Sequence, residues 1–233
     1  MIDKAIQEQI NYYKARANEY DEWFYRIGRY DYGVEINQRW FAEVEIIRNA
    51  LREQDKCQSI LELACGTGIW TQELIEIGEQ ITCIDASEEM IQINQQKLNG
   101  NDKNINIEYQ QLDVFSWQPQ AQYDLIFFAF WLSHVPPIMV NEFLQKVRRS
   151  VKPQGKLFII DSLFSQTSHA KNHHSRNERD INQKRKLNNG QTFEVFKIYY
   201  QQDSLKDKLI QAGFQNIDVK TTDNYFIYSS VEG

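Results

Sequence analysis

Two patterns of hydrophobic and polar positions divide this chain near residue 55. Residues 2–53 place apolar side chains at the three- and four-residue spacing of amphipathic helices. From residue 59 onward, short apolar runs alternate with longer amphipathic segments. We therefore predict an N-terminal helical cap over 1–55 and a core over 56–233.

The pattern of the core predicts that strands and helices alternate. We expect strands near 59–63, 81–85, 105–110, 123–129 and 156–161, and helices near 68–77, 88–99 and 138–150. Such alternation is typical of an α/β fold with parallel strands and helices on both faces of the sheet. Near the end of the chain we expect an extra strand at 192–200, a helix at 202–212 and a closing strand pair at 214–220 and 224–230. The polar segment 165–190 is expected to form a loop or a lid, although a solvated insertion would have the same composition.

The overall charge and the cysteines exclude several classes of protein. A net charge of −6 argues against a nucleic-acid partner, because phosphate binding needs a basic face. No apolar run is long enough to span a membrane. The chain has three cysteines, an odd number without zinc-site spacing, which favours a reducing, cytoplasmic location.

A glycine turn after the first strand suggests a binding site for a nucleoside cofactor. Gly66 and Gly68 leave room for a ligand above the turn. A nicotinamide site would have a third glycine at the position of Thr71, so a dinucleotide is disfavoured. Glu62 would repel a pyrophosphate but would attract an ammonium or sulfonium group.

Two further carboxylates follow the next strands. Asp85 ends the second strand, where a carboxylate can accept hydrogen bonds from both ribose hydroxyls. Asp113 follows the third strand and could accept from an adenine amine, with Val114 and Met90 against the ring. Taken singly, Asp85 could be a helix cap and Asp113 a turn residue; their order after Glu62 favours the cofactor site.

The segments that carry this pattern closely resemble successive motifs of class I S-adenosylmethionine-dependent methyltransferases. They are LELACGTG, CIDASEEM, QLDVF, YDLIFFAFWLSHVP and VKPQGKLFIID, and the N-terminal YYKARANEYDEW is similar to the cap of small-molecule members. The resemblance implies a Rossmann-like, seven-stranded sheet that binds S-adenosylmethionine at the carboxyl ends of its strands. By motif position, the cofactor-binding residues would be Glu62, Ala64, Gly66, Gly68, Asp85, Ala86, Met90, Asp113 and Val114. Ala64 occupies a position where many members have glycine, and we expect only a slight change of the loop.

The residues after the fourth strand are candidates for the acceptor side. His134 lies just beyond that strand, and its ordinary pKa would suit a general base, although it could equally cap the following loop. In the cap, Tyr20 is the residue that we expect to touch the cofactor, and Arg16 or Arg26 could bind a carboxylate of the cofactor or acceptor. Packing of the cap on the sheet would explain most of its other aromatic residues.

The segment 165–190 combines histidines with basic residues. We predict no metal site there, because His169, His173 and His174 lie in polar surroundings without a carboxylate at a suitable spacing. A solvated surface explains most basic segments, but this one could also attract an anionic acceptor. Its basic residues are Arg176, Arg179, Lys184, Arg185 and Lys186.

These patterns together predict a cytoplasmic methyltransferase that uses S-adenosylmethionine and acts on an oxygen or nitrogen of a small molecule. Two alternatives remain open at this point. One is a nicotinamide-dependent oxidoreductase on a similar sheet, and the other is a non-catalytic cofactor-binding protein. The sequence makes no prediction of the oligomeric state.

Overall fold

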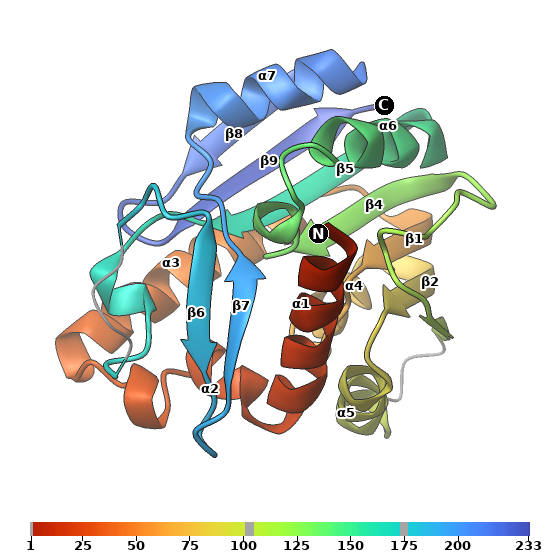
Figure 1. The fold of residues 1–233 in the computed structure, drawn as a ribbon. Helices are drawn as coiled ribbons and strands as arrows, with labels where there is room; N and C mark the ends of the chain where they lie inside the picture. The colour runs from red at the N-terminus through yellow and green to blue at the C-terminus, as the bar shows by residue number, and fades with distance from the viewer. Residues whose placement is uncertain (1, 101–104, 173–176) are drawn as a thin grey trace.

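A seven-stranded sheet forms the centre of the computed structural model, which describes residues 2–100, 105–172 and 177–233 (Figure 1). Its strand order is β3-β2-β1-β4-β5-β9-β8. The strands are β1 (Cys57–Leu63), β2 (Gly78–Asp85), β3 (Asn106–Gln111), β4 (Tyr123–Ala129), β5 (Val151–Ser162), β8 (Gln215–Thr221) and β9 (Phe226–Glu232). The pairs from β3 to β5 are parallel, and β9 runs antiparallel to both β5 and β8. The predicted α/β fold is therefore confirmed.

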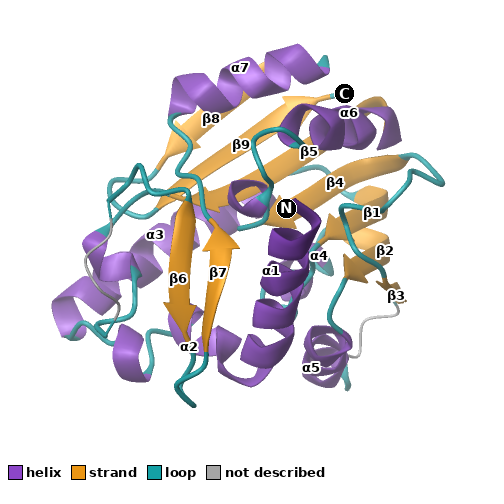
Figure 2. Ribbon diagram, in the orientation of Figure 1, coloured by secondary structure: helices purple, strands orange, loops and turns teal. Residues whose placement is uncertain are grey.

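Helices cover both faces of this sheet (Figure 2). Side chains alternate between the faces along each strand, so that Leu61 joins one hydrophobic cluster and Ile60 the other. The first cluster packs against α6 (Val140–Ser150) and α7 (Gln202–Ala212), and the second against α3 (Val34–Arg52) and α5 (Glu88–Leu98). Burial on both faces explains why the central strands are continuously apolar.

The helix predicted at 68–77 is wrong in extent. The structure has only the four-residue α4 (Thr71–Leu74) in this segment. The residues on both sides form turns, with Gly68 N bonded to Cys65 O at 3.2 Å and Ile77 N to Leu74 O at 3.1 Å. Burial of Ile69 and Ile75 produces a helix-like apolar spacing without a continuous helix.

The N-terminal helices lie at two different places. Two of them, α1 (Ile2–Arg16) and α2 (Tyr20–Phe24), lie near the carboxyl ends of the central strands (Figure 1). In contrast, α3 packs on a face of the sheet through Trp40 and Ile47, both fully buried. Two short 3-10 helices, η1 (Ala17–Glu19) and η2 (Gly28–Tyr30), connect these elements. The division of the chain at residue 55 stays a prediction.

A separate hairpin forms within and after the predicted loop 165–190. It pairs β6 (Asn182–Lys186) with β7 (Thr192–Phe196) and follows a 3-10 helix, η4 (Gln166–Ser168). The strand predicted at 192–200 is thus shorter and does not join the main sheet. The hairpin lies beside α1, because buried Gln9 accepts from Phe196 N at 3.1 Å and donates to His134 O at 3.0 Å (Figure 1).

The remaining predicted elements agree closely with the structure. The helix at 202–212 is found as α7, and the closing pair is β8 and β9. Throughout the parts of the chain that the structure describes, every helix is too short or too polar to cross a membrane.

Candidate active site

The turn after β1 adopts a backbone that favours glycine at three positions. Gly66 and Gly68 have φ values of +53° and +83°, and Ala64 has +54°. A side chain at position 68 would meet Asn94 Oδ1 at 2.5 Å, so glycine is also required there by space. Ala64 therefore takes up strain in a left-handed conformation, which is common at functional sites.

Glu62 lies at the base of this turn, almost completely buried. Its carboxylate accepts from Thr71 Oγ1 at 2.7 Å and from Cys83 Sγ at 3.5 Å. Burial raises the pKa of Glu62 to about 8, because no cation compensates its charge in the described part of the chain. A cationic ligand in the adjoining cavity would favour the ionised form.

Asp85 links the glycine turn to the second strand. Its two carboxylate oxygens accept from Gly66 N and Ser87 N, each at 2.9 Å. Burial raises its pKa to about 6, and these backbone bonds oppose the shift. Each oxygen keeps further acceptor capacity for a hydroxyl. The hydroxyl of Ser87 caps α5 by accepting from Met90 N at 3.2 Å.

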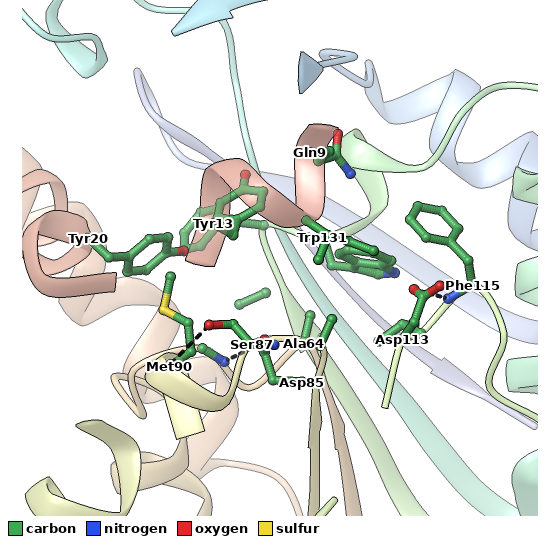
Figure 3. A pocket seen from close by; sticks show the side chains of 16 residues that line it. Gln9, Tyr13, Tyr20, Ala64, Asp85, Ser87, Met90, Asp113, Phe115 and Trp131 are labelled. Atoms are coloured by element: carbon green, nitrogen blue, oxygen red, sulfur yellow. Dashed lines mark hydrogen bonds between the residues drawn. The ribbon is translucent and has the colours of Figure 1, made fainter. Parts of the chain in front are cut away.

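The cavity above the strand ends is lined by residues from all of these segments (Figure 3). Asp113 lies at one end and accepts from Phe115 N at 3.0 Å. The rings of Phe115 and Trp131 line the cavity beside Asp113, with their centroids 4.9 Å apart. The buried indole nitrogen of Trp131 has no hydrogen-bond partner in the described residues.

Tyr13 and Tyr20 close the same cavity from the cap (Figure 3). The cap is attached to the glycine turn, because Thr67 Oγ1 donates to Asp21 Oδ1 at 2.5 Å. Lys97 forms an ion pair with the same aspartate at 2.5 Å. Burial raises the pKa of both Tyr13 and Tyr20, so their hydroxyls are protonated near neutral pH.

His134 lies in η3 (Leu132–His134), where β4 gives way to the next loop, and is 5% exposed. Its Nδ1 is bonded to the carbonyl oxygen of Phe196, so Nδ1 carries the hydrogen. Its Nε2 therefore accepts from the Tyr13 hydroxyl, at 2.8 Å. Burial, followed by the nearby charges of Lys197 and Arg185, lowers the pKa of His134 well below its usual range.

Three neighbouring cavities share two residues. The first is the cavity with Asp85 and Asp113, the second lies beside His134, and the third contains Glu62. Tyr20 and Phe130 line all three. Phe130 follows β4 with a φ of +56°, another strained non-glycine residue at the site.

The structure brings most of the predicted site residues together. The first cavity is lined by Tyr20, Ala64, Gly66, Asp85, Ala86, Met90, Asp113 and Val114. Glu62 lines the adjoining third cavity and His134 the second. Gly68 lines none of these cavities and instead lies against Asn94.

Several residues of the site were not found by sequence reasoning. Gln9, Ser87 and Phe115 line the first cavity, and Lys197 and Tyr199 line the second. Phe115 could have been inferred from its place two residues after Asp113. Lys197 had no such signal, since only folding brings it near His134.

No group of three potential metal ligands occurs within the described residues. His169 and Tyr199 both line the second cavity, and His169 Nε2 is hydrogen-bonded to the Tyr199 hydroxyl at 2.7 Å. His173, His174 and Arg176 lie outside the described residues. The absence of a metal site stays a prediction.

Comparison with known proteins gives consistent results. Residues 60–155 match a family described as a methyltransferase domain. A ubiquinone biosynthesis O-methyltransferase of Xanthomonas oryzae is 26% identical over 102 residues, 43% of this chain and 41% of the relative. A malonyl-[acyl-carrier protein] O-methyltransferase of Ilyobacter polytropus is 31% identical over 100 residues, 42% of this chain and 35% of the relative. The chain thus matches about two fifths of the length of these curated relatives.

Two solved structures resemble nearly the whole chain. One, described as a DhpI-SAM-HEP complex, has a TM-score of 0.76 and 29% identity and covers 98% of both chains. The other, described as a DhpI-SAH complex, has a TM-score of 0.74 and 29% identity. The match covers 97% of this chain and 96% of the chain in that structure. Residues 60–155 therefore match a methyltransferase domain, and the seven-stranded sheet has the fold of the class I S-adenosylmethionine-dependent methyltransferases.

Proposed function

We propose that this protein transfers a methyl group from S-adenosylmethionine to an oxygen or nitrogen atom of a small molecule. The observation that carries the proposal is the meeting of three cavities at Tyr20 and Phe130. A cofactor in the first and third cavities would present its methyl group to an acceptor in the second. In open α/β sheets, ligands bind at this carboxyl edge, where the strand order reverses between β1 and β4.

The side chains of the first and third cavities fit this cofactor. Glu62 is a buried carboxyl group with no cation beside it in the described part of the chain, and Asp85 has acceptor capacity for a ribose. The unpaired indole N–H of Trp131, beside Asp113, would donate to an adenine nitrogen. When bound, the cofactor supplies an electrophilic methyl group on a sulfonium.

The side chains around the second cavity would position the acceptor and exclude water. Much of the rate acceleration of such a transfer comes from alignment of the two reactants. Tyr13 lines both the first and the second cavity, and its hydroxyl is bonded to His134 Nε2. We propose that His134 accepts a proton from an acceptor directly or through Tyr13, or holds Tyr13 in place; its catalytic role stays a prediction.

Calorimetric titration with S-adenosylhomocysteine tests the cofactor, and labelled S-adenosylmethionine incubated with a cell extract tests the transfer. We expect binding and a labelled small molecule. Binding of NADH without affinity for S-adenosylhomocysteine would instead indicate an oxidoreductase. Cofactor binding without a labelled product would indicate a non-catalytic protein.

The location and other partners remain predictions as well. Cys57, Cys65 and Cys83 are all free, which is compatible with the expected cytoplasmic location. The acidic balance of the chain supports a small-molecule substrate over a nucleic acid.

A further inference from the structure

The second cavity is positively charged in a protein whose net charge is −6. Arg16, Arg185 and Lys197 line it, together with His134 and His169. Arg16 and Arg185 both act electrostatically on Tyr13 and on His134. The two guanidinium groups therefore influence the same small region, although they come from opposite ends of the sequence.

Lys197 already has a charge partner. Its Nζ lies 3.1 Å from Asp161 Oδ1 and also donates to Ser133 Oγ at 2.7 Å. Both members of this pair are almost completely buried. Lys197 therefore helps to shape the cavity but adds little uncompensated charge.

Arg16 lacks such a partner. Its side chain is 7% exposed, and no carboxylate in the described chain forms an ion pair with it. Its Nε has no acceptor among the residues that the structure describes, and its Nη2 donates to Tyr30 Oη at a long 3.4 Å. The rings of Tyr12 and Tyr20 lie beside the guanidinium, with their centroids 5.6 and 4.9 Å from Arg16 Cζ. A buried guanidinium without an anion is costly, so this arrangement fits a site that receives its anion from a ligand.

The nearest acidic residue along the chain does not fill this role. Glu19 pairs with Arg29 at 3.4 Å and accepts from Asn188 N at 2.9 Å. The two bonds use both oxygens of Glu19, and the bond from Asn188 holds the cap against the hairpin. Arg16 is therefore left without a carboxylate, within the residues that the structure describes.

Arg185 contributes a second guanidinium from the hairpin. It is half-buried on β6 and donates to Gln183 Oε1 at 2.9 Å, with no ion pair among the described residues. Its neighbour Lys184 is exposed and, by the alternation of a strand, points to the other face of the hairpin. Arg185 thus faces the cavity while Lys184 does not line it.

We propose that the methyl acceptor carries an anionic oxygen group, a carboxylate or a phosphate-type group, that binds between Arg16 and Arg185. Arginine suits this role because its planar donors match the oxygens of such groups in pairs. The inference rests on the proposed function and adds the charge of the substrate.

Fractionation of an extract tests the charge of the acceptor before its identity is known. A small-molecule extract is passed over an anion-exchange resin, and both fractions are incubated with labelled S-adenosylmethionine and enzyme. We expect the salt eluate to be methylated and the flow-through to be inactive. Treatment of the eluate with alkaline phosphatase identifies a phosphate monoester, since the enzyme hydrolyses such an ester but leaves a carboxylate or a phosphonate intact.

Arg185→Gln tests the site, with Lys184→Gln as the control that removes the same charge from the other face. We expect Arg185→Gln to raise the apparent KM for the eluate roughly tenfold or more, because a charge-assisted hydrogen bond to the anionic group would be lost. Lys184→Gln should leave it unchanged, and neither variant should alter S-adenosylhomocysteine binding. Arg16→Gln is expected to behave like Arg185→Gln. If Arg16→Gln fails to fold because Arg16 is buried, Arg185→Gln still tests the site, since Arg185 is only half-buried.

Three results would overturn the inference while leaving the proposed function standing. The first is methylation confined to the flow-through. The second is an equal KM for Arg185→Gln and Lys184→Gln. The third is a loss of S-adenosylhomocysteine affinity in both arginine variants, which would assign these residues to the carboxylate of the cofactor. Failure to bind S-adenosylhomocysteine at all would reject the proposed function, and this inference with it.

Discussion

The proposed cofactor side and the proposed acceptor side of this site differ in charge and in the elements that form them. The cofactor side is lined by Glu62, Asp85 and Asp113, which lie at or just beyond the carboxyl ends of β1, β2 and β3. The acceptor side is lined by Arg16 and Arg185. These come from a helix of the cap and from a hairpin outside the main sheet.

This difference shows which part of the site depends on the sheet. Parallel strands deliver their carboxyl ends to one edge, so the residues there are neighbours wherever the sheet forms. The acceptor side depends on how the cap and hairpin pack over that edge. It can change its charge and shape without disturbing the cofactor side.

The largest effect is expected for a variant that lowers turnover without changing cofactor affinity. Replacement of His134 by alanine should lower turnover roughly 100-fold or more, the usual contribution of a group that handles a proton. S-adenosylhomocysteine affinity should not change, because His134 lines only the second cavity. Steady-state rates and calorimetry measure the two effects.

Tyr13→Phe is the matched variant for this test, since it removes only the hydroxyl that donates a hydrogen bond to His134 Nε2. If the pair acts as a unit, the double variant should be no slower than the slower single variant. Wild-type turnover in His134→Ala would leave this histidine with a structural role.

A substitution on the cofactor side should instead lower the affinity for S-adenosylhomocysteine. Asp85→Ala should weaken S-adenosylhomocysteine binding by about 1–3 kcal/mol, roughly 5- to 150-fold, because it leaves buried polar partners without an acceptor. Titration calorimetry measures this loss. Asp55→Ala, at an exposed position, is the control. Equal affinities in the two variants would remove Asp85 from the cofactor site.

The pH dependence of cofactor binding should report on Glu62. In the free protein its pKa is raised to about 8, and a cationic ligand would lower it. Binding would therefore release a proton below pH 8, so affinity should fall as the pH falls, by up to about tenfold per unit. Calorimetry in buffers of different ionisation enthalpy measures the proton release. Glu62→Gln should abolish this dependence, and an unchanged proton release in that variant would assign it to another group.

The smallest expected effect concerns the boundary between the two sides. Tyr20→Ala should weaken S-adenosylhomocysteine binding several-fold, in line with about 1 kcal/mol for the loss of an aromatic contact. The ring also lies beside Arg16, so acceptor KM should rise in the same variant. A variant that changes neither quantity would show that Tyr20 serves only to pack the cap. Tyr25→Ala, at an exposed ring of the same segment, is the control.

The sheet and the cofactor side could largely be predicted from the sequence. The strand at 123–129 and the helix at 202–212 agree with the structure residue for residue, because their apolar runs and end signals are local. Glu62, Asp85 and Asp113 could be placed for the same reason, since each has a fixed position relative to a strand end. The helix at 68–77 was wrong because buried turns produce the same apolar spacing as a helix.

The acceptor side was decided by tertiary packing. Lys197 near His134, and Arg16 within reach of the hairpin, are separated in sequence by distances that no local pattern spans. The strand at 192–200 showed its apolar pattern, but which strand it would pair with depended on β6 and on the docking of α1. Local periodicity determined which segments became strands and which carboxylates stood at their ends. The burial of Arg16 without a carboxylate partner arose only when distant segments came together, since charge compensation depends on neighbours in space.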